Sequence, residues 1–132
     1  MSVVILVVDD EPDVEALYRQ HFRRDLRQGV FTMLFALSAA EALEQLAIVD
    51  ASELILILSD INMPGMNGLD LLARIKASRP GLPVVMVTAY GDSDTRRQVD
   101  ERGADGLFVK PVDFAALRAE IDARIAHHGL RS

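Results

Sequence analysis

The stretch Leu54-Ile55-Leu56-Ile57-Leu58-Ser59-Asp60-Ile61-Asn62-Met63-Pro64-Gly65 decides the fold of this chain. Its aliphatic run, residues 54 to 58, predicts a strand covered on both faces, which is typical of a parallel sheet between two layers of helices. Asp60 stands between this strand and a tight turn at residues 62 to 65. Ligands of open parallel sheets bind beyond the carboxyl ends of the strands. The position of Asp60 therefore predicts a chemical role.

Polar side chains follow three other predicted strands in the same way. The pair Asp9-Asp10 comes after residues 3 to 8, Thr88 after residues 84 to 87, and Lys110 after residues 107 to 109. Because parallel strands end at the same edge of a sheet, we expect these groups and Asp60 to converge on one pocket.

Aliphatic runs alternate with helical patterns along the whole chain, which predicts an α/β fold of five strands and five helices. The first helix is expected from Val14 to Leu26, with Gly29 as its stop. Ser38 and Glu41 form a capping-box pattern for the second helix, and Asp113 is the expected cap of the fifth. The fourth helix, residues 93 to 102, has only Val99 as a large aliphatic residue and is predicted to be among the least stable elements. The second and fourth strands are expected at residues 31 to 37 and 83 to 88, and the third helix at residues 68 to 78.

Composition limits the class of protein. A chain of 132 residues, half of them hydrophobic, suits one domain with a sizeable core, and the absence of cysteine fits a reducing compartment, so the cytoplasm is expected. No apolar run approaches the roughly 20 residues of a membrane span. A net charge of −6 without a basic stripe argues against direct binding to nucleic acid.

The predicted pocket has the composition of a magnesium site. Asp9, Asp10 and Asp60 would repel one another unless a cation lay between them. Carboxylates without histidine or cysteine match Mg²⁺ better than zinc or a fully caged calcium. Asp60 is then the candidate attacking group in a phosphoryl transfer, with Lys110 and Thr88 available to the phosphoryl oxygens.

Four segments resemble the receiver domains of two-component response regulators: residues 7–11, 59–68, 87–89 and 109–111 occur in the typical order and spacing. The resemblance covers essentially the whole chain. It implies a flavodoxin-like doubly wound (βα)5 fold, with a sheet of order 2-1-3-4-5 and helices on both faces. It also implies a cis peptide bond between Lys110 and Pro111.

By this resemblance, Asp60 accepts a phosphoryl group from a sensor histidine kinase or phosphotransfer protein. Asp10 would be a direct Mg²⁺ ligand with Asp60 and the backbone carbonyl of Asn62, and Asp9 would act through a water. Thr88 and Lys110 would contact the phosphoryl group. Such a protein is a signalling switch that assists its own phosphorylation and dephosphorylation, not a metabolic enzyme.

One position departs from the family pattern. Leu107 stands where the family usually has Tyr or Phe, and the neighbouring Phe108 points to the opposite face of the sheet. Our hypothesis is that Thr88 still moves, that the helix at residues 93 to 102 shifts with it, and that Tyr90 is the aromatic partner.

Two other functions stay open. A haloacid-dehalogenase-like phosphatase would need a second acid where this chain has Asn62. A receiver-like scaffold would bind partners without being phosphorylated. Simpler structural roles also exist for the single motifs: Asp9-Asp10 as a turn or helix cap, and His21, His127 and His128 as surface or tail residues.

The expected boundaries are a receiver domain at residues 1–126 and a short tail at residues 127–132. An output domain is not evident, so the target is a separate partner or a domain missing from this sequence. A homodimer through the fourth helix, fifth strand and fifth helix is a further hypothesis. Its surface would include Arg96, Arg97, Asp100, Glu101, Asp105 and Arg118.

Overall fold

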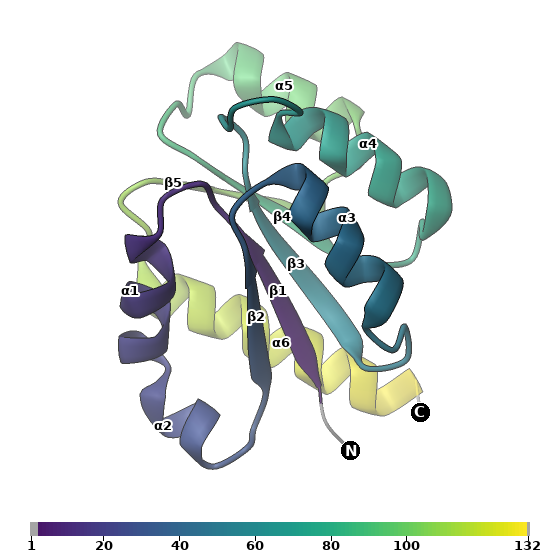
Figure 1. Ribbon diagram of the computed structural model, residues 1–132. Helices are drawn as coiled ribbons and strands as arrows, with labels where there is room; N and C mark the ends of the chain where they lie inside the picture. Colours follow the sequence, from purple (N-terminus) through teal and green to yellow (C-terminus); the bar gives the residue numbers. More distant parts are fainter. Residues whose placement is uncertain (1–2, 132) are drawn as a thin grey trace.

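A five-stranded parallel sheet forms the centre of the computed structural model, which describes residues 3–131 (Figure 1). The strand order is β2-β1-β3-β4-β5, so the predicted order is confirmed. The strands are β1 (Val4–Val8), β2 (Thr32–Ala36), β3 (Leu54–Asp60), β4 (Val84–Thr88) and β5 (Gly106–Val109).

Helices cover both faces of this sheet, so the doubly wound architecture is also confirmed. The first layer contains α1 (Asp13–His21), α2 (Arg23–Arg27) and α6 (Phe114–Arg131), and the second contains α3 (Ala39–Ile48), α4 (Gly68–Ser78) and α5 (Ser93–Glu101). Within residues 3–131, no helix is long and apolar enough to cross a membrane.

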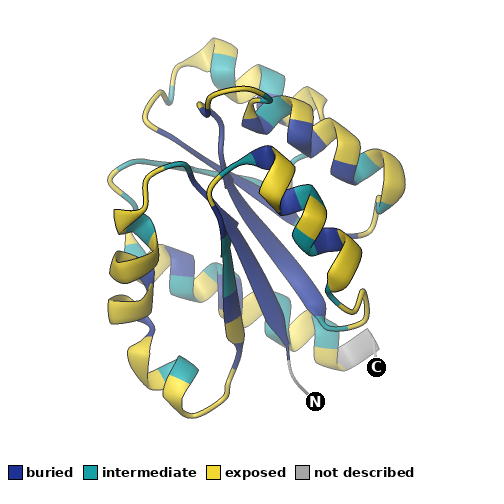
Figure 2. Cartoon of the chain, in the orientation of Figure 1, coloured by how far each residue is buried: buried dark blue, intermediate teal, exposed yellow. Residues whose placement is uncertain are grey.

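Burial follows the expected pattern of a covered parallel sheet. Every residue of β1, β3 and β4 is buried, whereas the edge strands β2 and β5 are partly exposed (Figure 2). Alternate residues of β1 serve the two layers: Ile5 and Val7 pack with α1 and α6, and Leu6 and Val8 pack with α3 and α4. The rigid centre therefore fixes where the strand ends lie.

Capping occurs where the sequence predicts it. The Ser38 hydroxyl accepts a hydrogen bond from the Glu41 N–H, and the Asp113 carboxylate accepts bonds from Ala115 and Ala116 at the start of α6. Helix α5 buries only Val99, as its composition indicates.

Three boundaries differ from the prediction. The single helix expected from residue 14 to residue 26 is divided at Phe22, whose ring is buried among Tyr18, Phe31 and Phe114. Strand β3 continues to Asp60 because Asp60 still pairs with β4. Helix α6 continues to Arg131, so residues 127 to 131 extend that helix and do not form a separate tail; residue 132 lies outside the described residues.

Candidate functional site

The carboxyl ends of the strands bring four of the predicted site residues together. The Lys110 ammonium lies 3.2 Å from Asp9 Oδ2 and 3.3 Å from Asp60 Oδ2. The Lys110 N–H donates to the carbonyl of Thr88 at 2.7 Å, which joins the ends of β4 and β5. Asp9 follows β1 and Lys110 follows β5, yet their side chains meet because all the parallel strands of the sheet end at the same edge.

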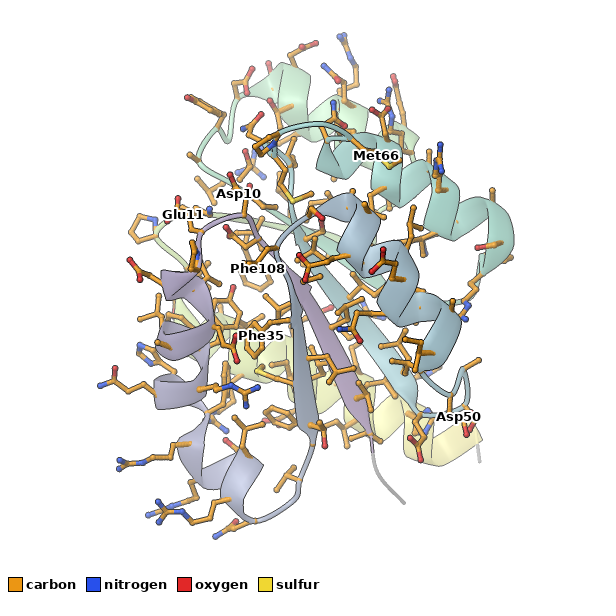
Figure 3. All side chains as sticks on the ribbon, in the orientation of Figure 1. Asp10, Glu11, Phe35, Asp50, Met66 and Phe108 are labelled. Carbon is orange, nitrogen blue, oxygen red and sulfur yellow. The ribbon has the colours of Figure 1, made fainter. Side chains whose placement is uncertain are left out.

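A cluster of three carboxylates occupies the centre of the site. Asp9, Asp10 and Asp60 each place one oxygen within 4.8 Å of the others. Asp9 and Asp60 are only 7% and 6% exposed, and Asp10 is half-buried near the surface, where Figure 3 shows it at the end of β1. One ammonium group faces two buried carboxylates, so negative charge remains for a cation to neutralise. A small divalent ion with oxygen ligands fits this donor set.

The close packing of charged groups shifts the pKa values of Asp60 and Lys110. Burial raises the pKa of the Asp60 carboxyl, the charge of Asp9 raises it further, and Lys110 with the Asn62 N–H opposes both effects. Partial burial lowers the pKa of Lys110, but the charges of Asp60 and Asp9 outweigh it, so the pKa is raised overall. Lys110 therefore stays protonated, whereas the ionised form of Asp60 is disfavoured by its surroundings.

Backbone amides orient the two buried carboxylates. The Glu11 N–H donates to Asp9 Oδ1 at 3.0 Å, and the Asn62 N–H lies 3.4 Å from Asp60 Oδ1. Both bonds connect a carboxylate to the residue two places further on, which holds each aspartate at the start of its turn. The Lys110–Pro111 peptide bond is cis, as the family resemblance implies.

Glycine at position 68 lets helix α4 approach the backbone of Asp60. A Cβ atom there would lie 2.0 Å from the Asp60 carbonyl oxygen, far inside van der Waals contact. The Gly68 N–H donates to the Ile61 carbonyl at 2.7 Å, and the Asn67 side chain caps the helix by accepting from the Asp70 N–H. Gly68 is thus a positioning residue for Asp60. Sequence reasoning placed it only at a helix start, because the close contact is visible only in the structure.

The proposed switch residues differ in their burial and in the layer that they contact. Thr88 is fully buried and its hydroxyl oxygen accepts a hydrogen bond from the Tyr90 N–H at 3.0 Å. Tyr90 is 64% exposed. Leu107 packs with the layer of α3, α4 and α5, and Phe108 with the opposite layer, as strand alternation predicts. A cavity of about 360 Å³ beside Thr88 is lined by Asn62 and Tyr90, among other residues.

A buried tyrosine lies near the acidic cluster. Tyr18 on α1 is 4% exposed, and its ring packs edge-on against Phe114 at 5.4 Å between centroids. Burial raises the pKa of its hydroxyl to about 12, with further contributions from Asp9 and Asp60. The phenol therefore stays neutral near the acidic cluster.

Together, this sheet order and this acidic pocket define a class of doubly wound domains with an aspartate-centred site at the strand ends. The family model described as "Response regulator receiver domain" matches residues 5–122, so the chain belongs to the receiver domains of response regulators. It is a signalling domain of two-component systems.

Individual relatives agree with this assignment. The chain is 33% identical over 118 residues to "Sporulation initiation phosphotransferase F" of Bacillus subtilis, covering 89% of this chain and 90% of that protein. It is 36% identical over 125 residues to "DNA-binding transcriptional regulator NtrC" of Escherichia coli K12, covering 95% of this chain but 25% of that protein. The chain thus spans about a quarter of the length of several curated relatives.

The structure of response regulator TrrA of Thermotoga maritima "in complex with Mg(2+)-BeF" superposes with a TM-score of 0.75 at 28% identity, covering 92% of this chain and 98% of that one.

Proposed function

We propose that this domain is a phosphoacceptor switch, in which Asp60 takes a phosphoryl group from a histidine kinase or phosphotransfer protein. The observation that carries the proposal is the contact of the Lys110 ammonium with Asp9 and Asp60 inside a cluster of three carboxylates. Such a site combines a nucleophile, a fixed positive charge and oxygen ligands for a metal, which are the parts that phosphoryl transfer needs.

In the proposed reaction, a carboxylate oxygen of Asp60 forms a bond to phosphorus while the bond from phosphorus to the donor's histidine nitrogen breaks. The bonding electron pair leaves with that nitrogen, and an acyl phosphate remains on Asp60. Lys110 neutralises charge on the transferred group, and the Thr88 hydroxyl donates a hydrogen bond to it. The Asn62 N–H keeps Asp60 in its turn.

Mg²⁺ fits the donor set of this site. Asp10, Asp60 and the backbone carbonyl of Asn62 would hold it directly, and Asp9 through a water. When bound, it supplies positive charge to the phosphoryl oxygens. The superposition on a relative crystallised with Mg²⁺ and BeF supports the same assignment here.

The added phosphoryl charge then changes the conformation around Thr88. Helix α5 lies next to Thr88 in the fold and is easily displaced because it buries only Val99. Tyr90 and Leu107 border the moving region, and the Tyr90 backbone N–H donates to the Thr88 hydroxyl oxygen at 3.0 Å.

The target is a downstream partner or an output domain, and the working compartment is the cytoplasm. Four of the six residues of the predicted dimer surface are already paired within the chain: Asp105 with Lys76 at 2.8 Å, Arg118 with Asp25 at 2.7 Å, and Arg97 with both Asp94 and Glu101 of α5 itself. A homodimer would therefore rely on Arg96 and Asp100, which form no ion pair within residues 3–131.

Mass spectrometry of the intact chain after incubation with acetyl phosphate tests the proposal. The native chain should gain one phosphoryl group with Mg²⁺ and none with a chelator, and Asp60→Asn should gain none. Asp122→Asn removes the same charge from the exposed side of α6 and should behave as the native chain does. A folded native chain that gains nothing would instead favour the phosphorylation-independent scaffold.

A further inference from the structure

Helix α2 presents three arginines without partners. This five-residue helix, Arg23-Arg24-Asp25-Leu26-Arg27, has no buried side chain. Arg23, Arg24 and Arg27 are exposed. In the part of the chain that the structure describes, no carboxylate lies within salt-bridge distance of their guanidinium groups.

The three guanidinium groups share one side of the helix. Arg27 is three residues from Arg24 and four from Arg23, the spacings at which helical side chains are neighbours. Like charges at these spacings destabilise a helix. The one acid of the helix, Asp25, is engaged by Arg118 of α6 at 2.7 Å and cannot offset them. A chain of net charge −6 thus keeps an uncompensated basic cluster.

Contacts from the rest of the fold hold α2 in place while the arginines stay free. Besides the ion pair with Asp25, the Arg118 guanidinium lies over the buried Phe22 ring, 5.1 Å from its centroid. The Val30 N–H also donates to the Asp25 carbonyl at 2.9 Å. A fixed backbone lowers the ordering cost when exposed side chains bind a partner.

We infer that the α2 surface, defined by Arg23, Arg24 and Arg27, docks an acidic segment of a partner protein that offers two or three carboxylates about one helical turn apart. Guanidinium groups bind carboxylates through paired hydrogen bonds. Three arginines are few for nucleic acid, where about six to ten phosphates are commonly engaged. They also fall short of the roughly four to eight basic residues of anionic-lipid sites.

The surface lies at the end of the sheet opposite the phosphoacceptor site. The segment after α2 enters β2 at Thr32, which pairs with Val4 at the start of β1. Asp10, at the other end of β1, lies far from α2 (Figure 3). Side chains that end in nitrogen point outward around α2 in the same view. A partner on this surface therefore leaves Asp60 uncovered, and its affinity is the same with and without phosphorylation.

Titration of the isotope-labelled full chain with a helical peptide tests the inference by nuclear magnetic resonance. The peptide is alanine-based and carries four glutamates on two successive turns; its twin carries glutamines instead. The glutamate peptide should shift the amides of residues 19 to 30, with or without beryllofluoride. The double variant Arg23→Gln/Arg27→Gln should weaken binding at least about fivefold, the contribution of one good exposed ion pair.

A matched control separates this surface from general charge attraction. Arg74→Gln/Arg102→Gln removes the same charge from two exposed arginines on α4 and beyond α5. Equal weakening in both double variants, or equal shifts with the glutamine twin, would overturn the inference. Tighter binding of single-stranded DNA or phosphatidylserine vesicles through residues 19 to 30 would assign the surface to another polyanion. If the double variant lost its circular dichroism spectrum, the single variant Arg24→Gln, expected to weaken binding about twofold, would decide.

Discussion

Replacing Gly68 with alanine should damage both the stability of the fold and the reactivity of Asp60. The new Cβ would lie 2.0 Å from the Asp60 carbonyl oxygen and 2.8 Å from Ile61 Cα. Both contacts are backbone atoms that cannot rotate away, so the start of α4 and the end of β3 must separate by about 1 Å. Overpacking of this kind costs about 1–3 kcal/mol, which lowers the melting temperature by several degrees in a domain of this size.

The same displacement should slow phosphorylation, because a misplacement of about 1 Å can reduce the rate by up to about a hundredfold. Thermal unfolding and the rate of phosphorylation by acetyl phosphate measure the two effects. Gly81→Ala is the control, since no atom lies within 4 Å of its added Cβ and its φ is not positive. If Gly68→Ala matched this control in both measurements, the account of Gly68 as a positioning residue would be wrong.

Three further predictions concern the pocket and the switch. The folded-state pKa of Asp60 is raised above its ordinary value of 3.8, so the ionisation of Asp60 lowers the stability of the fold as the pH rises above 3.8. Asp60→Asn should therefore have a higher melting temperature than the native chain at pH 7, and this difference should vanish below pH 3.8. A difference that persists at low pH would rule out the ionisation of Asp60 as its cause. Lys110→Ala leaves Asp9 and Asp60 without their cation and should lower the free energy of unfolding at pH 7 by about 1 kcal/mol after allowance for solvent screening. Denaturant titration measures this loss, and added Mg²⁺ should restore part of the lost stability. An unchanged free energy of unfolding in the absence of Mg²⁺ would contradict this electrostatic role of Lys110. Amide exchange with and without beryllofluoride should differ in α5 and around Thr88, and unchanged protection throughout residues 88 to 110 would refute the switch hypothesis.

The sequence predicts the convergence of Asp9, Asp10, Asp60 and Lys110 because parallel strands that end in polar residues leave little choice of geometry. It does not predict the helix break at Phe22. Apolar residues continue at helical spacing through Leu26, and the break depends on a ring cluster that includes Phe114 from the other end of the chain. Long-range packing of this kind has no local signal.

Two structural features were missed for different physical reasons. The close approach of Gly68 to Asp60 depends on backbone positions that no spacing rule supplies. The net charge of the whole chain, −6, gives no sign of the basic cluster on α2. Four arginines and one aspartate nevertheless lie between residues 19 and 28. A local charge count would have found it, but only the structure distinguishes the free arginines from the paired Arg19.

The most direct test of the central claim locates the phosphoryl group on the chain. Borohydride reduces an acyl phosphate on aspartate to homoserine, and peptide sequencing by mass spectrometry identifies the altered position. After phosphorylation with acetyl phosphate and Mg²⁺, homoserine should stand at position 60 and not at positions 9 or 10. Homoserine at either neighbour, or at no aspartate of a folded chain, would contradict Asp60 as the phosphoacceptor.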